Sequence, residues 1–314
     1  MERIFHYAIN SSHLNETVGS FLRDAGYSRH VMAHLKRTDH GICVNGVPVF
    51  TNRLLYPGDD LCIRLQEDVS SEHIPPVPMD LTIVYEDDDL LVLCKPADMP
   101  IHPSQGNYDN TLANGVAWYY ASRGDSFVYR CINRLDRDTT GLLIIAKHML
   151  SAAVLSQSLL HREIHRTYLA LVQGNPPERG TIDRPIGRVA GSTIERRIDE
   201  KHGERAVTHF WTLAHFPGYS LVQLRLETGR THQIRVHMAS LGHPLLGDFL
   251  YNPGCRLMNR QALHSYKLEF PHPITGETLC FTAPPPQDMA ALLGDYSLQD
   301  NSSMGMTLPR SSST

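Results

Sequence analysis

The sequence lacks an apolar run of about 18 residues, the length that would cross a bilayer as a helix. It also lacks a basic start followed by an apolar segment, which is the pattern of a secretory leader. Its six cysteines are scattered with no Cys-x-x-Cys pair, so they predict reduced thiols in a cytoplasmic protein. No Gly-rich phosphate loop is present, and the sequence therefore implies no nucleotide cofactor.

An excess of basic residues is also missing. The formal net charge is −4 and the isoelectric point is near 6.5, whereas proteins that bind nucleic acids are usually basic. The total charge therefore gives no indication of an RNA partner. The positive charge is unusual in kind, with 24 Arg and 5 Lys. Arg suits bidentate recognition of phosphates and carboxylates, but a GC-rich coding sequence would produce the same bias.

The length of 314 residues allows one large domain and a small one. Near the N-terminus, apolar spacing predicts a helix within residues 15–26, and Ser28 can cap a second helix. Short β-like runs at Gly41–Gly46 and Leu61–Leu65 complete a small module. We therefore divide the chain into a small α/β module (1–68), a Pro-rich linker (69–80), an α+β domain (81–295) and a disordered tail (296–314).

A dense charged turn precedes an apolar run in the middle of the chain. The stretch Asn133-Arg-Leu-Asp-Arg-Asp138 places two carboxylates and two guanidiniums before Leu142–Ala146. Residues 136–140 also satisfy Asp-x-Asp-x-Thr, a pattern of phosphatases with an aspartyl nucleophile and Mg²⁺. That chemistry requires the first Asp at the C-terminal end of a buried parallel strand, whereas here the apolar run follows the motif. A phosphatase is therefore only a minor alternative.

A second group of polar residues lies within residues 226–248. Thr231 can cap a helix that Gly242 and Pro244 terminate. Arg235 lies in the apolar alternation of this helix and is expected to face the sheet, where an unpaired charge is costly. It therefore requires a carboxylate. An ion pair within the helix is the alternative, but the nearest acids, Glu227 and Asp248, lie outside it.

A third segment predicts a β-strand. Residues 167–172 alternate, with Tyr168, Ala170 and Val172 on one face and Thr167, Leu169 and Leu171 on the other. Tyr168 lies near the start of this strand, where side chains often line a cleft. Taken alone, a Tyr in a strand belongs more often to the core than to a site.

Ordered sequence blocks carry a resemblance to a known family. They are Glu86–Pro103, Arg134–Leu142, Arg166–Ala170, and Gly229–His237 with Gly242–Asp248. Over nearly all of residues 80–285 the chain resembles the RluA/RluD-type family of RNA pseudouridine synthases. The resemblance implies an α+β catalytic domain with a central mixed, mostly antiparallel sheet. It also implies an isomerase that works without a cofactor.

The same resemblance implies roles for individual residues. Asp136 is the catalytic carboxylate, Tyr168 stacks on the target base and takes part in proton transfer at C5, and Arg235 pairs with Asp136. Arg134 resembles the residue that inserts into RNA as the uridine is flipped out. Arg230 and His232 are expected to contact RNA as well.

The N-terminal module resembles the alpha-L type RNA-binding module of a small-subunit ribosomal protein. This resemblance implies that its second helix lies on RNA, with Arg29, His30, Lys36 and Arg37 at phosphates. The alternative is that these charges are the solvated face of a helix.

Two further features qualify the prediction. The family usually has His where this chain has Asn133. Asn still forms hydrogen bonds but carries no charge, so we expect it to adjust loop geometry or a phosphate contact without abolishing activity. The pairs His161/His165 and His232/His237 could bind zinc, but no third ligand is set nearby. No metal site is therefore expected.

These observations predict a cytoplasmic, monomeric RNA pseudouridine synthase without membrane contact. Its predicted substrate is large-subunit (23S) ribosomal RNA, and tRNA is the alternative. A non-catalytic RNA-binding assembly factor on the same fold is the alternative from another class of protein.

Overall fold

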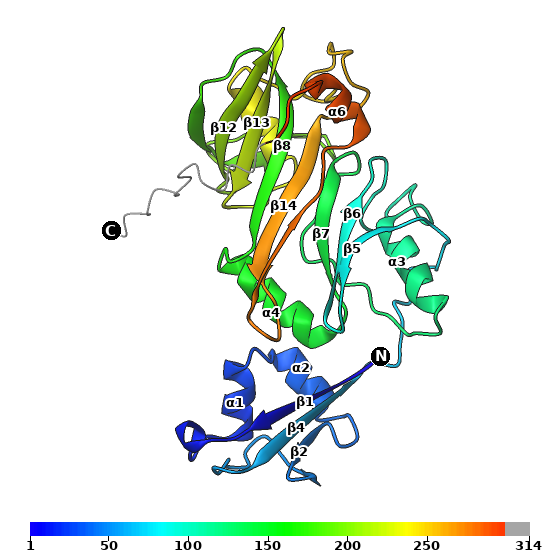
Figure 1. Ribbon diagram of the computed structural model, residues 1–314, viewed down its shortest axis with the longest axis vertical. Coiled ribbons are helices and arrows are strands. Elements are labelled where there is room, and N and C mark those ends of the chain that lie inside the picture. Colours follow the sequence, from blue (N-terminus) through cyan, green and yellow to red (C-terminus); the bar gives the residue numbers. More distant parts are fainter. Residues whose placement is uncertain (299–314) are drawn as a thin grey trace.

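The computed structural model describes residues 1–298 of the chain. A small N-terminal unit lies at one end of a longer body that is built on a single large sheet (Figure 1). The predicted disordered tail begins at residue 296, and its residues 299–314 lie outside the described part. Tyr296 packs edge-on against Phe216, with 6.2 Å between the ring centroids.

The N-terminal unit packs two short helices against a four-stranded antiparallel sheet of order β1-β4-β2-β3. The side chains of Thr17 and Ser28 accept hydrogen bonds from backbone N–H groups in the first turns of the two helices, as predicted for Ser28. Its elements are β1 (Glu2–Ala8), the 3₁₀ turn η1 (Ser11–His13), α1 (Val18–Asp24), α2 (Arg29–Leu35), β2 (Ile42–Val44), β3 (Val47–Pro48) and β4 (Asp60–Gln66).

The body is organised around a nine-stranded sheet of order β5-β6-β7-β14-β8-β13-β12-β9, with β15 paired to β14. The pair β14 and β7 is parallel and the other pairs are antiparallel, so the predicted mixed, mostly antiparallel sheet is confirmed. The strands are β5 (Thr82–Glu86), β6 (Leu90–Lys95), β7 (Thr140–Ala146), β8 (His165–Gln173), β9 (Arg179–Asp183), β12 (Val207–Phe216), β13 (Tyr219–Leu226), β14 (Leu263–Pro271) and β15 (Thr278–Thr282).

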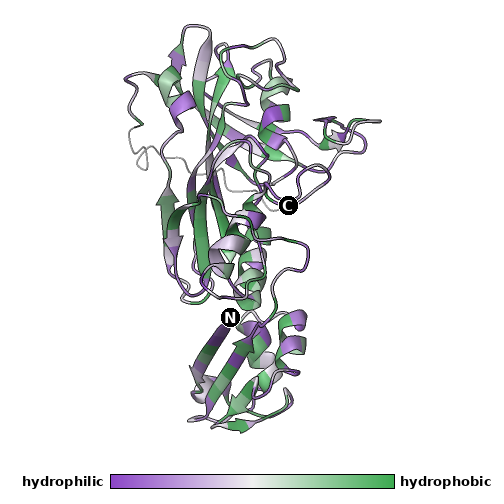
Figure 2. Ribbon diagram, turned by 90° about the vertical axis from the view of Figure 1, so that its right-hand side faces the viewer, coloured by the Kyte–Doolittle hydropathy of each residue, from purple (hydrophilic) through white to green (hydrophobic). Residues whose placement is uncertain are grey.

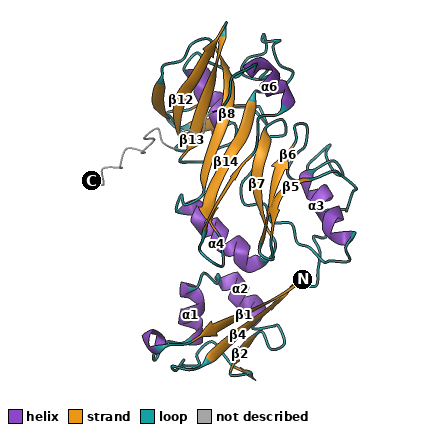
Figure 3. Ribbon diagram, in the orientation of Figure 1, coloured by secondary structure: helices purple, strands orange, loops and turns teal. Residues whose placement is uncertain are grey.

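Helices cover both faces of this sheet (Figure 3). A separate antiparallel hairpin joins β10 and β11 next to the sheet. The remaining elements are α3 (Leu112–Ala121), α4 (Met149–Leu160), β10 (Ile186–Arg188), β11 (Arg196–Ile198), α5 (Gln233–Ser240) and α6 (Gln287–Leu293). Within residues 1–298 no helix is both long enough and apolar enough to cross a bilayer.

Strand β8 shows how the sheet separates two cores. Tyr168, Ala170 and Val172 join the core that holds α3 and α5, whereas Leu169 and Leu171 join the core that holds α6. The predicted period-2 pattern is therefore confirmed. Figure 2 shows the corresponding hydrophobic colouring along the central strands.

Helix α4 of the body packs against the N-terminal unit, and Figure 1 shows it between the large sheet and that unit. Leu150 of α4 is buried in the same core as Val31 and Leu35 of α2. Glu67 adds polar contacts across the junction, because its carboxylate pairs with Arg130 and accepts a hydrogen bond from the backbone N–H of Met149 at 3.0 Å. Apolar and ionic contacts thus both stabilise the junction.

Candidate active site

A cavity of about 710 Å³ opens on the face of the sheet that carries α5. Its volume lies in the range of roughly 300–1,000 Å³ that is usual for small-molecule pockets. It is lined by the loop before β7, the start of β8 and the turn between β13 and α5. The lining includes two carboxylates, Asp136 and Glu227, and six arginines: Arg134, Arg137, Arg162, Arg166, Arg230 and Arg235. The cavity is therefore locally basic although the whole chain is acidic.

Asp136 lies in the loop that runs into β7, and buried groups fix this loop. The side chain of Asn133 is 2% exposed, and its Oδ1 accepts a hydrogen bond from the Ile144 backbone N–H at 2.9 Å. Asn133 therefore holds the loop against β7. Asp136 itself precedes the strand, so the arrangement required of the phosphatase motif is absent here.

Arg235 joins the loop to a second carboxylate. Its Nε and Nη2 donate to the two oxygens of Asp248 at 2.7 and 2.8 Å, and its Nη1 donates to Asp136 Oδ2 at 3.2 Å. The Arg235 side chain is 2% exposed and that of Asp248 is fully buried. Burial alone would lower the pKa of Arg235, but the hydrogen bonds and charges of Asp248 and then Asp136 raise it. Arg235 is thus a permanent cation that fixes one face of Asp136.

Tyr168 lies in β8 and lines the same cavity, although its side chain is 4% exposed. Burial raises the pKa of its hydroxyl, and the negative charge of Asp136 acts in the same direction. The nearby Arg166 guanidinium and a hydrogen bond with Ser265 oppose this shift. Tyr168 is therefore neutral near neutral pH, and it lines the cavity in which a ligand would lie.

Two arginines of the charged turn differ in their contacts. Arg134 is exposed at the cavity lining, and no carboxylate among residues 1–298 forms an ion pair with it. Arg137 pairs with Asp98 on the neighbouring loop, with Nε 2.6 Å from Oδ1. Arg137 therefore supports the loop, whereas Arg134 keeps its charge free for a ligand.

The start of α5 differs from the prediction. Thr231 does not cap the helix, because the N-cap is His232, which has a left-handed backbone with φ of 57° and no side-chain capping bond. Gln233 instead fixes the turn, since its Oε1 accepts from the Thr228 hydroxyl at 2.8 Å and from the Arg230 backbone N–H at 3.0 Å. Arg230 is exposed and pairs with Glu204 at the cavity rim.

Sequence reasoning missed two residues of this site. Asp248 was only one of two acids near Arg235, and nothing in its sequence context showed that it would be buried. Arg166 precedes Tyr168 by two residues, lines the cavity and is 9% exposed, and its Nε–H has no hydrogen-bond partner within residues 1–298. An Arg at an alternate position of a buried strand is the one signal that could have identified it.

Lys95 lies beneath the Asp136 loop. Its side chain is 1% exposed, and its Nζ donates to the backbone carbonyls of Arg137 at 2.7 Å and of Pro96 at 2.8 Å. Burial lowers the pKa of Lys95 to about 7, although the charges of Asp138 and Asp136 act in the opposite direction. The loop therefore rests on a buried amine that is only partly charged at neutral pH.

We expect Lys95→Met to slow turnover, because the loop loses two anchoring hydrogen bonds, and to change how stability depends on pH. An unfolded Lys has a pKa near 10.4, so between pH 7 and 10 the unfolded wild type binds more protons than the folded one. Its free energy of unfolding should therefore rise with pH by about 2 kcal/mol between pH 7 and 9. Urea unfolding at the two pH values measures this rise, which the variant should lack.

The matched control for Lys95→Met is Lys267→Met. Lys267 is partly exposed and pairs with Glu269 at 3.5 Å. Its variant should keep the rise in stability with pH that the wild type shows. Parallel pH curves for the wild type and Lys95→Met would contradict the assignment.

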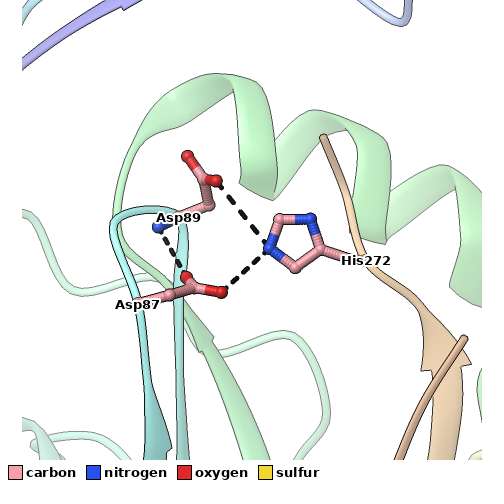
Figure 4. Close-up of side chains that lie close together, drawn as sticks. All are labelled: Asp87, Asp89 and His272. Atoms are coloured by element: carbon pink, nitrogen blue, oxygen red, sulfur yellow. Dashed lines mark hydrogen bonds and ion pairs between the residues drawn. The ribbon is translucent and has the colours of Figure 1, made fainter. Parts of the chain in front are cut away.

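A second cluster of ionisable groups lies at the turn between β5 and β6. Asp87, Asp89 and His272 place ligand-type atoms within 4.8 Å of one another, and Figure 4 shows the His272 ring directed at both carboxylates. The Nε2 atom of His272 lies 2.9 Å from Asp87 Oδ2. Asp89 Oδ1 also accepts a hydrogen bond from Arg3 Nη2 at 2.8 Å, and it lies 2.9 Å from His148 Nε2. Protein groups therefore already bind these carboxylate oxygens. The contact of Arg3 with Asp89 joins the N-terminal unit to the body.

A cavity lined by six arginines, two carboxylates and one buried tyrosine is the site of an enzyme that handles a polyanionic substrate. A family profile described as RNA pseudouridylate synthase matches residues 89–240. Together with the relatives described next, this match shows that the chain belongs to the RNA pseudouridylate synthase family.

Relatives match over most of their length. The chain is 45% identical over 258 residues to the uncharacterized RNA pseudouridine synthase YhcT of Bacillus subtilis, covering 81% of this chain and 85% of that protein. It is 38% identical over 265 residues to ribosomal large subunit pseudouridine synthase D of Vibrio cholerae, covering 80% of this chain and 82% of that protein. The human protein RNA pseudouridylate synthase domain containing 1 has a similar solved structure, with a TM-score of 0.56 and 29% identity over 67% of this chain and 85% of that one.

Proposed function

We propose that this pseudouridine synthase isomerises uridines in large-subunit ribosomal RNA. Several relatives that match most of this chain are named ribosomal large subunit pseudouridine synthase D, which supports the choice of RNA. The observation that carries the catalytic proposal is the contact of Arg235 with both Asp136 and buried Asp248. We further propose that the enzyme acts as a cytoplasmic monomer.

The reaction breaks the N1–C1′ bond of uridine and joins C1′ to C5 of the same base. C5 loses a proton and N1 gains one, so no atom or electron enters or leaves overall. Asp136 acts on the ribose as nucleophile or base, and Arg235 keeps the carboxylate oriented. Tyr168 stacks on the base and takes part in proton transfer at C5. Its hydroxyl is neutral, so it accepts the C5 proton only while passing its own proton on.

The base can reach this cavity only outside its helical stack. Unstacking costs a few kcal/mol, which enzymes of this kind offset with stacking and inserted side chains. Arg134 is exposed and lacks a carboxylate partner within residues 1–298, so it is suited to replace the flipped base. In this proposal Arg230 and Arg166, which also line the cavity, contact the phosphates that flank the target.

The test of the substrate uses the purified chain with ribosomal RNA and tRNA in separate reactions. Pseudouridine is then mapped along each RNA. We expect new pseudouridine in large-subunit ribosomal RNA. Product in tRNA alone would overturn the ribosomal assignment, and no product in either RNA would overturn the catalytic one in favour of an assembly factor.

We also propose that the N-terminal unit contacts RNA phosphates through α2. Arg29, His30, Lys36 and Arg37 are exposed on this helix and just after it. The triple change Arg29→Glu, Lys36→Glu and Arg37→Glu should weaken RNA affinity by roughly 10- to 100-fold at 0.15 M salt, and should lower the slope of log affinity against log salt by about 2. Filter binding over a salt series measures both quantities.

The matched control keeps the charge, with Arg29→Lys and Arg37→Lys. A point charge is enough for a phosphate contact, so affinity should stay near that of the wild type. An unchanged salt slope in the Glu variant would mean that these residues are only a solvated helix face.

A further inference from the structure

His232 lines the cavity in an unusual conformation. It is the N-cap of α5, yet its backbone lies in the left-handed region with φ of 57° and its side chain caps nothing. Non-glycine residues in this region are uncommon, and such conformations are concentrated at functional sites. The conformation turns the imidazole toward Asp136 on one side and Tyr251 on the other.

The contacts of Tyr251 determine which ring nitrogen of His232 carries the proton. The Tyr251 hydroxyl oxygen lies 3.0 Å from the backbone nitrogen of Arg196, which can only donate. The hydroxyl proton is then free to donate to His232 Nδ1, 3.1 Å away. If Nδ1 carried the proton instead, the Tyr251 hydroxyl would accept two hydrogen bonds and its own proton would lack an acceptor. The Arg196 N–H, the Tyr251 hydroxyl and the imidazole all find partners only when the imidazole proton is on Nε2.

The surroundings of His232 favour this neutral form. Burial lowers the pKa of His232, and Arg235 and Arg196 act in the same direction, while Asp136 and Asp248 oppose it. The protonated Nε2 faces Asp136 Oδ2 at 3.9 Å, which is too long for a direct hydrogen bond. Within residues 1–298 no acceptor lies within hydrogen-bond distance of this Nε2–H group, so it can donate to a ligand bound beside Asp136.

Tyr251 also connects this donor to the hairpin of β10 and β11. Its ring packs on the Arg235 guanidinium, with 5.2 Å from Cζ to the ring centroid, and its hydroxyl holds the β11 backbone at Arg196. The hairpin shares a small core with α5, in which Ile186 packs with Val236. The position of Tyr251 therefore depends on the hairpin and on the Arg235 pair together.

We propose that His232 donates a hydrogen bond from Nε2 to the O2 carbonyl oxygen of the target uracil, and that Tyr251 is the positioning residue that fixes this tautomer. The inference rests on the proposed function. When the N1–C1′ bond breaks, negative charge spreads from N1 to O2, beside the ribose carbon on which Asp136 acts. A fixed donor at O2 stabilises that charge more in the transition state than in the ground state. This holds whether Asp136 attacks the ribose or deprotonates it.

Tyr251→Phe tests the positioning role. We expect kcat to fall roughly 10- to 100-fold with KM within about two-fold of the wild type, because the donor acts on developing charge. Tyr219→Phe is the matched control, since its hydroxyl donates to the Leu292 carbonyl at 2.7 Å outside the cavity. It should keep the wild-type rate. Equal kcat values for Tyr251→Phe and the wild type would overturn the inference.

His232 is tested by the kind of side chain that replaces it. His232→Phe removes the donor and should lose at least as much kcat as Tyr251→Phe, whereas His232→Gln retains an amide N–H and should recover much of it. RNA that carries 2-thiouridine at the target weakens the acceptor at this position. This RNA should lower the kcat of the wild type but should lower the kcat of His232→Phe little further. An additive defect would place the donor on another atom and overturn the O2 assignment.

A spectroscopic measurement separates this inference from the proposed function. In ¹⁵N-histidine-labelled protein, the His232 signal is identified by its loss in His232→Gln. It should show the Nε2–H tautomer in the wild type and a mixture in Tyr251→Phe. A wild-type Nδ1–H tautomer would overturn the inference even in an active enzyme. A wild type that forms no pseudouridine would overturn the proposed function, whatever the tautomer.

Discussion

Asp136→Asn should abolish pseudouridine formation while leaving the fold and RNA binding intact. The amide is neither a nucleophile nor a base at the ribose, so the rate should fall by roughly 10⁴-fold or more. The fold should survive because Asp136 is 26% exposed and Arg235 keeps both hydrogen bonds to Asp248. The Asn oxygen can also still accept from Arg235 Nη1. Single-turnover assays, RNA binding and thermal unfolding measure the three properties.

The matched control is Asp98→Asn, the same chemical change on a neighbouring loop. Asp98 is 72% exposed and pairs with Arg137, so it supports the charged turn without lining the cavity. Its variant should keep a rate within a few-fold of the wild type. If Asp136→Asn retained the wild-type rate, Asp136 would not be the reacting carboxylate. If it lost RNA binding together with the rate, Asp136 would have a structural role.

Local patterns predicted much of the sheet but not all of it. Strands that are buried along nearly all of their length, such as β7 and β8, carried clear signals. β14 did not, because its pairing register with β8 shifts between Ser265 and Lys267 and this shift breaks the alternation. β1 was also missed: the burial of its residues alternates along the strand, but Ile4 lies on the exposed face and Arg3 on the more buried one, so its sequence shows no apolar alternation.

The candidate site shows where sequence reasoning ends. Burial of Arg235 and its need for a carboxylate followed from its place in an apolar alternation. Glu227 and Asp248 were equal choices until the fold separated them. Glu227 instead lies 2.9 Å from His209 and 2.8 Å from Arg162. Asp136, 99 residues before Arg235, reaches it only through the packing of α5 on the sheet. Long-range pairing of this kind leaves no local trace, and only the resemblance to the family implied it.

Among the variants described, Asp248→Asn should produce the largest loss in the free energy of unfolding. The variant would leave the buried Arg235 charge with Asp136 as its single charged partner, and breaking a buried pair costs about 3–5 kcal/mol. Asp248 Oδ1 also accepts hydrogen bonds from the backbone N–H groups of Leu250 and Tyr251 at 3.0 and 3.2 Å. The amide can satisfy only part of this set. Urea unfolding at pH 7 measures the loss, and turnover should fall as well because Arg235 no longer has a fixed position.

Asp288→Asn is the matched control, because Asp288 forms the same two-pronged pair with Arg260, with distances of 2.6 and 2.8 Å. Its side chain is 45% exposed, whereas that of Asp248 is fully buried. Solvent screening should limit its loss to about 1 kcal/mol. Equal losses for the two variants would show that bidentate geometry matters here and burial does not. A much larger loss at Asp248 would show that Asp136 is oriented by an ion pair whose strength comes from exclusion of water.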